Sequence, residues 1–259
     1  MKVFTYSITD FGLCWTFNSQ NFDEILHRDT LSEDFDIFRA KNSSKFEDKG
    51  EIFDNLTSND GTQWTLKDGY TTRDHNVRPF RAAKKNKFLI ELGLDRRFSA
   101  CQFTGLGYKL MLHLPNEIAT LFHQKLFLET RNSAEISLSA VSHKTSDDLR
   151  RFQPAVRGCY FEGERKLKFF KIYTKSHCDF ECLTNFTLKL CGCVKFSMPR
   201  TPQTPVCDLD KVLCYTEAMN RWPEEETDPP CDCYPPCNDI KYTAQVIRDS
   251  ESREIGSLG

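Results

Sequence analysis

The sequence has no long apolar run and no large excess of charge. None of its segments approaches the roughly 20 consecutive apolar residues that a membrane-spanning helix needs. The formal net charge is −2, which gives no reason to expect a nucleic acid or an anionic membrane surface as a partner. The first 15 residues carry Thr, Ser and Asp within their apolar stretch and lack a clean cleavage site, so they make a poor signal peptide.

Signatures of catalysis are also absent. The sequence contains no G-x-S-x-G, no H-E-x-x-H and no glycine-rich phosphate loop. Its six histidines are scattered along the chain, at His27, His75, His113, His123, His143 and His177. We therefore predict a protein that is not an enzyme, with no cofactor, no catalytic residue and no metal site.

What the sequence does have is cysteine. Ten of the 12 cysteines lie between Cys159 and Cys237. An even number at this density predicts a disulfide framework and an oxidising compartment. Zinc is the rival interpretation, and His177 beside Cys178 invites it, but ten ligands would not fill a whole number of four-coordinate sites.

The spacing of four of these cysteines suggests how they pair. Cys178 and Cys182 would lie about 6 Å apart on one face of a helix, and Cys231 and Cys233 about 6.6 Å apart on one face of an extended strand. If that strand runs antiparallel to the helix, nesting gives the pairs Cys178–Cys233, Cys182–Cys231, Cys159–Cys237, Cys191–Cys214 and Cys193–Cys207. Spacing alone leaves other connectivities open.

Three sequence motifs carry a family resemblance. They are CGCVKFSMPR at 191–200, CDCYPPCN at 231–238 and CWTFN at 14–18. Together with the cysteine order, they resemble the degenerin/epithelial sodium channel (amiloride-sensitive sodium channel) superfamily, especially its insect pickpocket branch. Trp15 stands where the family usually has Tyr. The resemblance covers about 1–20 and 88–247.

The resemblance implies an α+β fold, with a β-sheet palm, a disulfide-braced helical thumb and a polar finger-like insertion. The family pairs its thumb cysteines in the nested way given above. Its members carry two flanking transmembrane helices and a selectivity filter, which are missing from this chain. The implied order is a palm/finger boundary strand at 1–20, an irregular polar insertion at 21–87, palm strands with a knuckle-like helix at 88–158, the Cys-rich thumb at 159–237, a palm return strand at 238–249 and a tail at 250–259.

Local patterns predict the elements within this order. Strands are expected at 3–8, 88–94, 108–114, 135–142 and 240–247. Helices are expected at 116–127, around Cys178 and Cys182, and at 208–222, with a helical turn at 147–152.

Two cysteines and three asparagines complete the candidate sites. The family's match to Cys14 pairs with a cysteine near the first membrane helix, so we expect Cys14 to be unpaired or to lack its partner. Cys101 is the other cysteine outside the cluster, and a Cys14–Cys101 bridge stays open. Asn42, Asn55 and Asn185 begin glycosylation sequons.

The resemblance implies the extracellular part of a sodium channel subunit at the plasma membrane, gated by ligand, acid or mechanical force. Its implied partners are other channel subunits in a homo- or heterotrimer. It would also contact sodium ions in the missing pore and the plasma membrane at the missing helices. No nucleic-acid partner is expected. The alternative is a secreted or truncated Cys-rich binding module without channel activity. The acidic residues Asp147, Asp148, Glu217 and Glu224 to Glu226 fit either acid sensing or a solvated surface.

Overall fold

A computed structural model describes residues 4–17, 19–20, 22–32, 64–65, 69–70, 90, 107–129, 132–222 and 231–251. The strands are β1 (Phe4–Thr9), β2 (Gly12–Phe17), β3 (Trp64–Thr65), β4 (Gly69–Tyr70), β5 (Gly107–Met111), β6 (Lys125–Glu129), β7 (Asn132–His143) and β8 (Asp239–Glu251). The helices are α1 (Phe22–Ile25), η1 (Arg28–Thr30), η5 (Asp147–Arg151), α3 (Pro154–Arg157), α4 (Lys175–Cys191), η6 (Leu209–Lys211) and α5 (Val212–Arg221). The described part is therefore a mixture of helix and strand.

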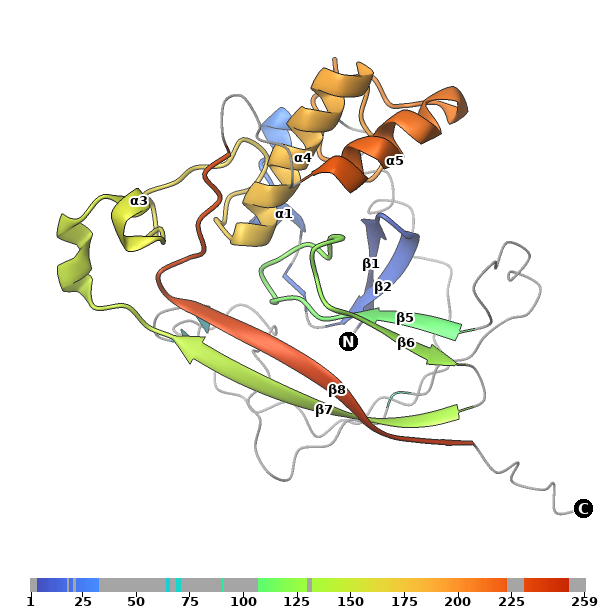
Figure 1. The fold of residues 1–259 in the computed structure, drawn as a ribbon, viewed down its shortest axis with the longest axis horizontal. Helices are drawn as coiled ribbons and strands as arrows, with labels where there is room; N and C mark the ends of the chain where they lie inside the picture. Colours follow the sequence, from blue (N-terminus) through green and yellow to red (C-terminus); the bar gives the residue numbers. More distant parts are fainter. Residues whose placement is uncertain are drawn as a thin grey trace, which may run out of the picture.

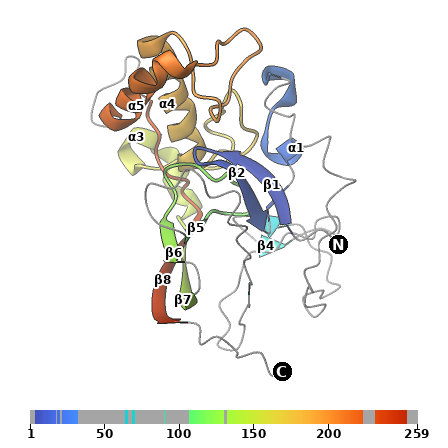
Figure 2. The same ribbon diagram turned by 90° about the vertical axis from the view of Figure 1, so that its right-hand side faces the viewer.

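The longest strands form a two-stranded antiparallel ribbon. β7 pairs with β8 along its whole length, with Leu138 opposite Ala244 and an irregularity between Glu135 and Ile136. The ribbon runs below the helices and carries the chain away from them (Figure 1). The hairpins β1–β2 and β5–β6 lie between the ribbon and the helices (Figures 1 and 2).

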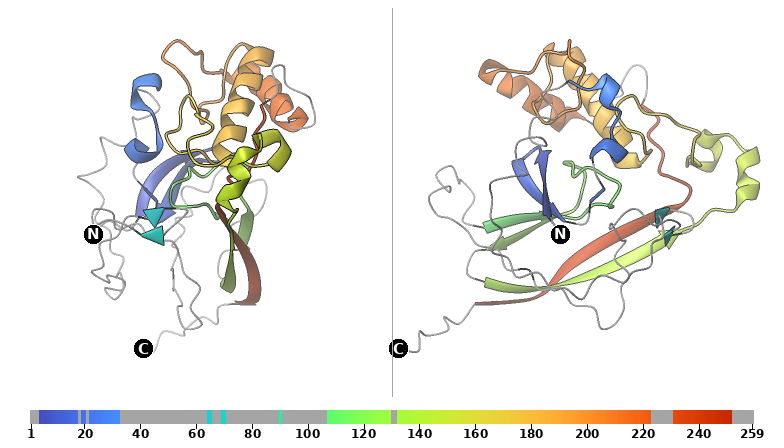
Figure 3. Two further views of the ribbon diagram at one scale, coloured as in Figure 1. Left: turned by 90° about the vertical axis from the view of Figure 1, so that its left-hand side faces the viewer. Right: turned by 180° about the vertical axis from the view of Figure 1, so that it is seen from behind.

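Residues 159–237, here called the disulfide module, are built around α4. The Thr174 side chain accepts a hydrogen bond from the backbone N–H of His177 and caps the start of this helix. Gly192 ends it in the left-handed conformation, with φ of 72°, which favours glycine. α5 packs beside α4 (Figures 1 and 3).

The hydrophobic core lies on the inner face of α4. It contains Phe180 and Leu183 from the helix, and the other members come from four separate segments: Ile25, Leu26, Ile118, Phe169, Phe170, Val194 and Met198. Ile118 belongs to the connection between β5 and β6. That connection therefore contributes directly to the core of the disulfide module.

The helix predicted over 116–127 is wrong. Residues 115–124 form turns, and the chain then enters strand β6. The backbone N–H of Glu117 bonds to the carbonyl of Leu114, whereas those of Ile118 and Thr120 bond to histidine rings. Since these donors are used elsewhere, the i to i−4 pattern of an α-helix is not formed.

The extended strand assumed for Cys231 to Cys233 is also wrong. Asp232 has φ of 46°, and the N–H of Tyr234 bonds to its carbonyl. The chain thus turns locally between the two cysteines. Other predictions fall outside the described residues: Cys101, Asn42, Asn55, most of the 88–94 strand and the tail from 252. In the part of the chain that the structure covers, no helix has both the length and the apolar character to cross a bilayer.

Candidate functional site

Five disulfides cross-link the disulfide module. They join Cys159 to Cys237, Cys178 to Cys233, Cys182 to Cys231, Cys191 to Cys214 and Cys193 to Cys207. Two of them form successive links along α4, with Cα separations of 5.6 Å at Cys178 and 6.0 Å at Cys182. The links at Cys191 and Cys193 hold the far end of α4 to the segment that leads into α5 and to α5 itself. The helix is therefore covalently fixed at both ends.

The two remaining site residues within the described ranges lie apart from this framework. Cys14 is a free, half-buried thiol on β2, and its Sγ lies 3.1 Å from the hydroxyl of Thr9. Asn185 is exposed on α4.

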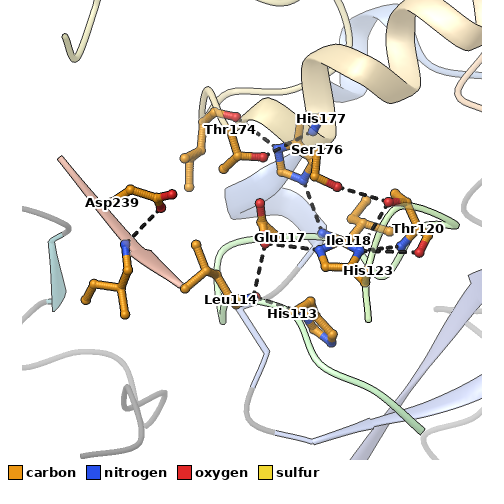
Figure 4. Close-up of polar contacts among 12 residues, drawn as sticks. His113, Leu114, Glu117, Ile118, Thr120, His123, Thr174, Ser176, His177 and Asp239 are labelled. Carbon is orange, nitrogen blue, oxygen red and sulfur yellow. Dashed lines mark hydrogen bonds and ion pairs between the residues drawn. The ribbon is translucent and has the colours of Figure 1, made fainter. Parts of the chain in front are cut away.

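The connection between β5 and β6, residues 112–124, is here called the junction loop. It lies between the amino-terminal end of α4 and strand β8, beside the disulfide module (Figures 1 and 4). Residues 114–120 of this loop are buried, although they include Asn116, Glu117 and Thr120. Polar groups that are buried in this way need partners, and the loop finds some of them within itself and others on α4.

His177 makes the central contact between α4 and the junction loop. Its Nε2 accepts the backbone N–H of Ile118 at 3.1 Å, and its Nδ1 donates to the carbonyl of Ile172 at 3.0 Å. The ring is fully buried and stacks on Phe170 at a centroid distance of 4.0 Å. Burial lowers the pKa of His177 to about 4, so the ring is neutral at neutral pH.

Glu117 gathers the polar groups of the junction loop. Its Oε2 accepts the N–H of Leu114 at 3.1 Å and lies 3.1 Å from Nε2 of His123. Burial on its own raises the pKa of this carboxyl, but His123, His177 and the hydroxyl of Thr174 stabilise the anion, and the resulting pKa is about 2. Figure 4 shows Glu117 among the histidines, with Asp239 at the start of β8 on the other side.

A second contact between the junction loop and α4 passes through hydroxyl groups. The hydroxyl of Thr120 lies 2.9 Å from that of Ser176, and the N–H of Thr120 donates to Nδ1 of His123 at 3.0 Å. Because Nδ1 accepts this hydrogen bond, Nε2 carries the proton that His123 donates to Glu117.

Gln124 connects the other end of the junction loop to the ribbon. Its side-chain amide donates to the carbonyl of Ala244 at 2.8 Å and accepts the N–H of Ala244 at 3.0 Å. This pair of bonds occupies a backbone donor and acceptor on the outer edge of β8, as a neighbouring strand would. The junction loop is thus bonded to α4 at one end and to β8 at the other.

A cleft of about 1920 Å³ opens between the disulfide module and the ribbon. His113, Asp179, Trp222 and Asp239 are among the side chains that line it. Burial raises the pKa of Asp239, whose carboxylate also accepts the N–H of Ile240 at 2.8 Å. Within the described ranges, no three His, Cys, Asp or Glu side chains are grouped as metal ligands would be.

This buried polar junction was not predicted from the sequence. The histidines are scattered along the sequence, whereas the structure brings His113, His123 and His177 together around Glu117. No spacing in the sequence links His177 to a loop that lies more than 50 residues before it. The one usable signal was the placement of Asn116, Glu117 and Thr120 in an otherwise apolar segment.

Comparison with known proteins places the chain in a family. The model of the amiloride-sensitive sodium channel family matches residues 1–255. The chain belongs to that family. Among its relatives in Drosophila melanogaster, Pickpocket protein 28 is 23% identical over 95% of this chain and 40% of its own length, and Pickpocket protein 11 is 29% identical over 54% of this chain and 27% of its own length.

Another relative is Sodium channel protein Nach of Drosophila virilis, which is 23% identical over 59% of this chain and 40% of its own length. The chain therefore spans 40% or less of the length of these relatives. Membership of the amiloride-sensitive sodium channel family confirms the predicted resemblance. It also confirms that the chain is not an enzyme, because this is a family of ion channels.

Proposed function

We propose that this chain is the extracellular part of a sodium channel subunit at the plasma membrane. The observation that carries the proposal is the family match over residues 1–255. In this proposal the disulfide module (159–237) is the thumb, the ribbon β7–β8 belongs to the palm, and residues 21–87 form the finger-like insertion. Sodium conduction belongs to the assembled homo- or heterotrimer, with the membrane helices as its pore.

The thumb's proposed role is to transmit the gating signal that a ligand, acid or mechanical force produces. Five disulfides restrict the internal motion of the module, so a displacement of one part moves α4 as a body. The junction loop offers a path for that displacement from His177 through Ile118, and then from Gln124 to Ala244 on β8. These contacts support a mechanical connection between thumb and palm.

The test is co-expression of the complete reading frame that encodes this chain with a pickpocket-type partner subunit in insect cells. We expect the chain to be cross-linked to the partner at the cell surface and to change the amiloride-sensitive sodium current. Gln124→Ala, which removes the connection to β8, should alter the gating response while cross-linking persists. Gln245→Ala, an exposed glutamine on the same strand, is the matched control.

Two outcomes would contradict the proposal. One is recovery of the chain alone in the medium, with no cross-link to a partner and no effect on the current, which would support the secreted Cys-rich binding module. The other is an equal response of Gln124→Ala and Gln245→Ala, which would remove the junction loop from the gating path.

A further inference from the structure

His177 accepts the Ile118 N–H only while its ring is neutral. Nδ1 is already protonated, because it donates to the carbonyl of Ile172, and Nε2 therefore offers the lone pair that Ile118 needs. A second proton on the ring would have to bind at Nε2. Two N–H donors would then face each other across 3.1 Å, and the bond would be lost.

The surroundings of His177 are buried, so the loss of this hydrogen bond is costly. Phe170 covers one face of the ring, and the side chain of Ile118 lies in the same hydrophobic core as Phe170 and Leu183. A buried backbone N–H that loses its acceptor carries a large desolvation cost. The loop can hydrate that N–H only by also exposing the Ile118 side chain, which takes it out of the core and loosens the loop from α4.

The ionisable groups around His177 have opposing effects on its charge. From the junction loop, Glu117 favours a charged ring, whereas His113 and His123 oppose it. On α4 itself, Lys175 and Asp179 neutralise each other in an ion pair of 2.7 Å. Asp239 faces the junction from β8 (Figure 4).

We infer that protonation of His177 weakens the connection between the disulfide module and the ribbon. A proton taken up at Nε2 breaks the Ile118 hydrogen bond. The Thr120–Ser176 hydroxyl contact and the packing of Ile118 then remain as the loop's contacts with α4, so the connection from the module to β8 is weakened. Burial places the uptake well below the ordinary range of histidine, so the contact holds at neutral pH and opens in acid. For channel gating, which rests on the proposed function, acid then weakens the response to a displacement of the thumb.

The test compares hydrogen exchange of residues 114–124 in the full 259-residue chain at pH 7 and pH 4. The key variant is His177→Gln, whose amide supplies one acceptor and one donor but takes up no proton. Comparing variant with wild type at the same pH removes the intrinsic pH dependence of exchange. The matched control is His143→Gln, because His143 is an exposed histidine on β7.

At pH 7 His143→Gln should protect the loop as the wild type does, and His177→Gln, which loses the stacking on Phe170, is compared with its own protection at pH 7. From pH 7 to pH 4 the loop protection of the wild type and of His143→Gln should fall at least about tenfold more than that of His177→Gln, which corresponds to one pKa unit or more. An equal fall in the wild type and in His177→Gln would overturn the inference. The experiment measures no current, so its failure would leave the proposed channel function untouched.

If His177→Gln does not fold, the wild type labelled with ¹⁵N-histidine supplies the test. We expect one imidazole to keep its proton on Nδ1 far below the ordinary histidine range and to titrate together with the loss of loop protection. If loop protection is lost at a pH where that ring is still neutral, the inference fails.

Discussion

The disulfide module and the β7–β8 ribbon achieve their order by different physical means. The module holds five disulfides and a core in which Leu183, Val194 and Met198 are fully buried. The ribbon has backbone pairing along its length, but Val246 and Ile247 are 41% and 63% exposed. A two-stranded sheet of this kind is marginal by itself, so its position depends on what it touches.

This difference indicates which parts of the molecule are free to move relative to one another. Covalent links and a packed core restrict internal motion of the module, whereas the ribbon has neither along its outer part. The junction loop packs Ile118 into the core of the module and is bonded to α4 and to β8 by hydrogen bonds, one of which has a titratable acceptor. The contacts that pH can change therefore lie between the two regions.

Breaking one link along α4 should have the largest effect. Cys182→Ala or Cys231→Ala removes one bridge while Cys178–Cys233 still joins the neighbouring residues, which costs about 2–4 kcal/mol. The double variant should lose about the same as either single variant, because both remove one bond. Denaturant unfolding of the three variants measures this, with Cys14→Ala as the control.

The control should change the free energy of unfolding by less than about 1 kcal/mol, because Cys14 takes part in no disulfide. Losses at Cys182 and Cys231 that add in the double variant would contradict the pairing of these two residues.

Lowering the pH should have the second-largest effect, by weakening the contact between the junction loop and α4. The folded pKa of His177, about 4, lies below the ordinary value of 6.5, so the unfolded chain binds more protons between these values. The free energy of unfolding should be constant above pH 6.5 and fall by about 3 kcal/mol as the pH drops to 4. Glu117, with a folded pKa of about 2 against 4.5, extends the loss from pH 4.5 downward.

Urea unfolding across this pH range measures the effect. His177→Gln should reduce the slope between pH 6.5 and 4, and part of the slope should remain because burial also lowers the pKa of His113. His143→Gln should leave the curve as in the wild type. A wild-type curve without slope in this interval would show that His177 takes up its proton equally in both states.

The two regions also differed in how much of them could be predicted. Periodicity indicated β7 and β8, because alternating residues such as Ile136 and Leu138 report a half-buried strand directly. The cysteine spacing suggested the same pairs that the structure contains, even though Asp232 turns where an extended strand was assumed. The junction could not be predicted, since His177 meets Ile118 only through tertiary packing, and that contact itself removes the helix expected at 116–127.

Releasing the ribbon from the junction loop should have a smaller effect. Gln124→Ala removes both hydrogen bonds to Ala244, at a cost of about 1–3 kcal/mol because the backbone groups that lose their partners belong to a buried residue. The amide of Ala244 should exchange faster, while α4 keeps its protection. Gln245→Ala is the matched control, and loss of α4 protection in Gln124→Ala would mean that the two regions fold as one.

A substitution on the exposed side of α4 should have the smallest effect on the free energy of unfolding, in contrast to one on its buried side. Asn185 is exposed, whereas Thr187, two residues later in the same sequon, is fully buried. A glycan on Asn185 therefore projects to solvent, and Asn185→Gln should change the free energy of unfolding by less than about 0.5 kcal/mol. Secreted wild-type chain should lose more mass on enzymatic deglycosylation than this variant does, by one glycan. An equal mass loss would show that Asn185 is unmodified. The reason would be that Thr187 is buried in the folded helix, so the sequon is accessible only before α4 has packed.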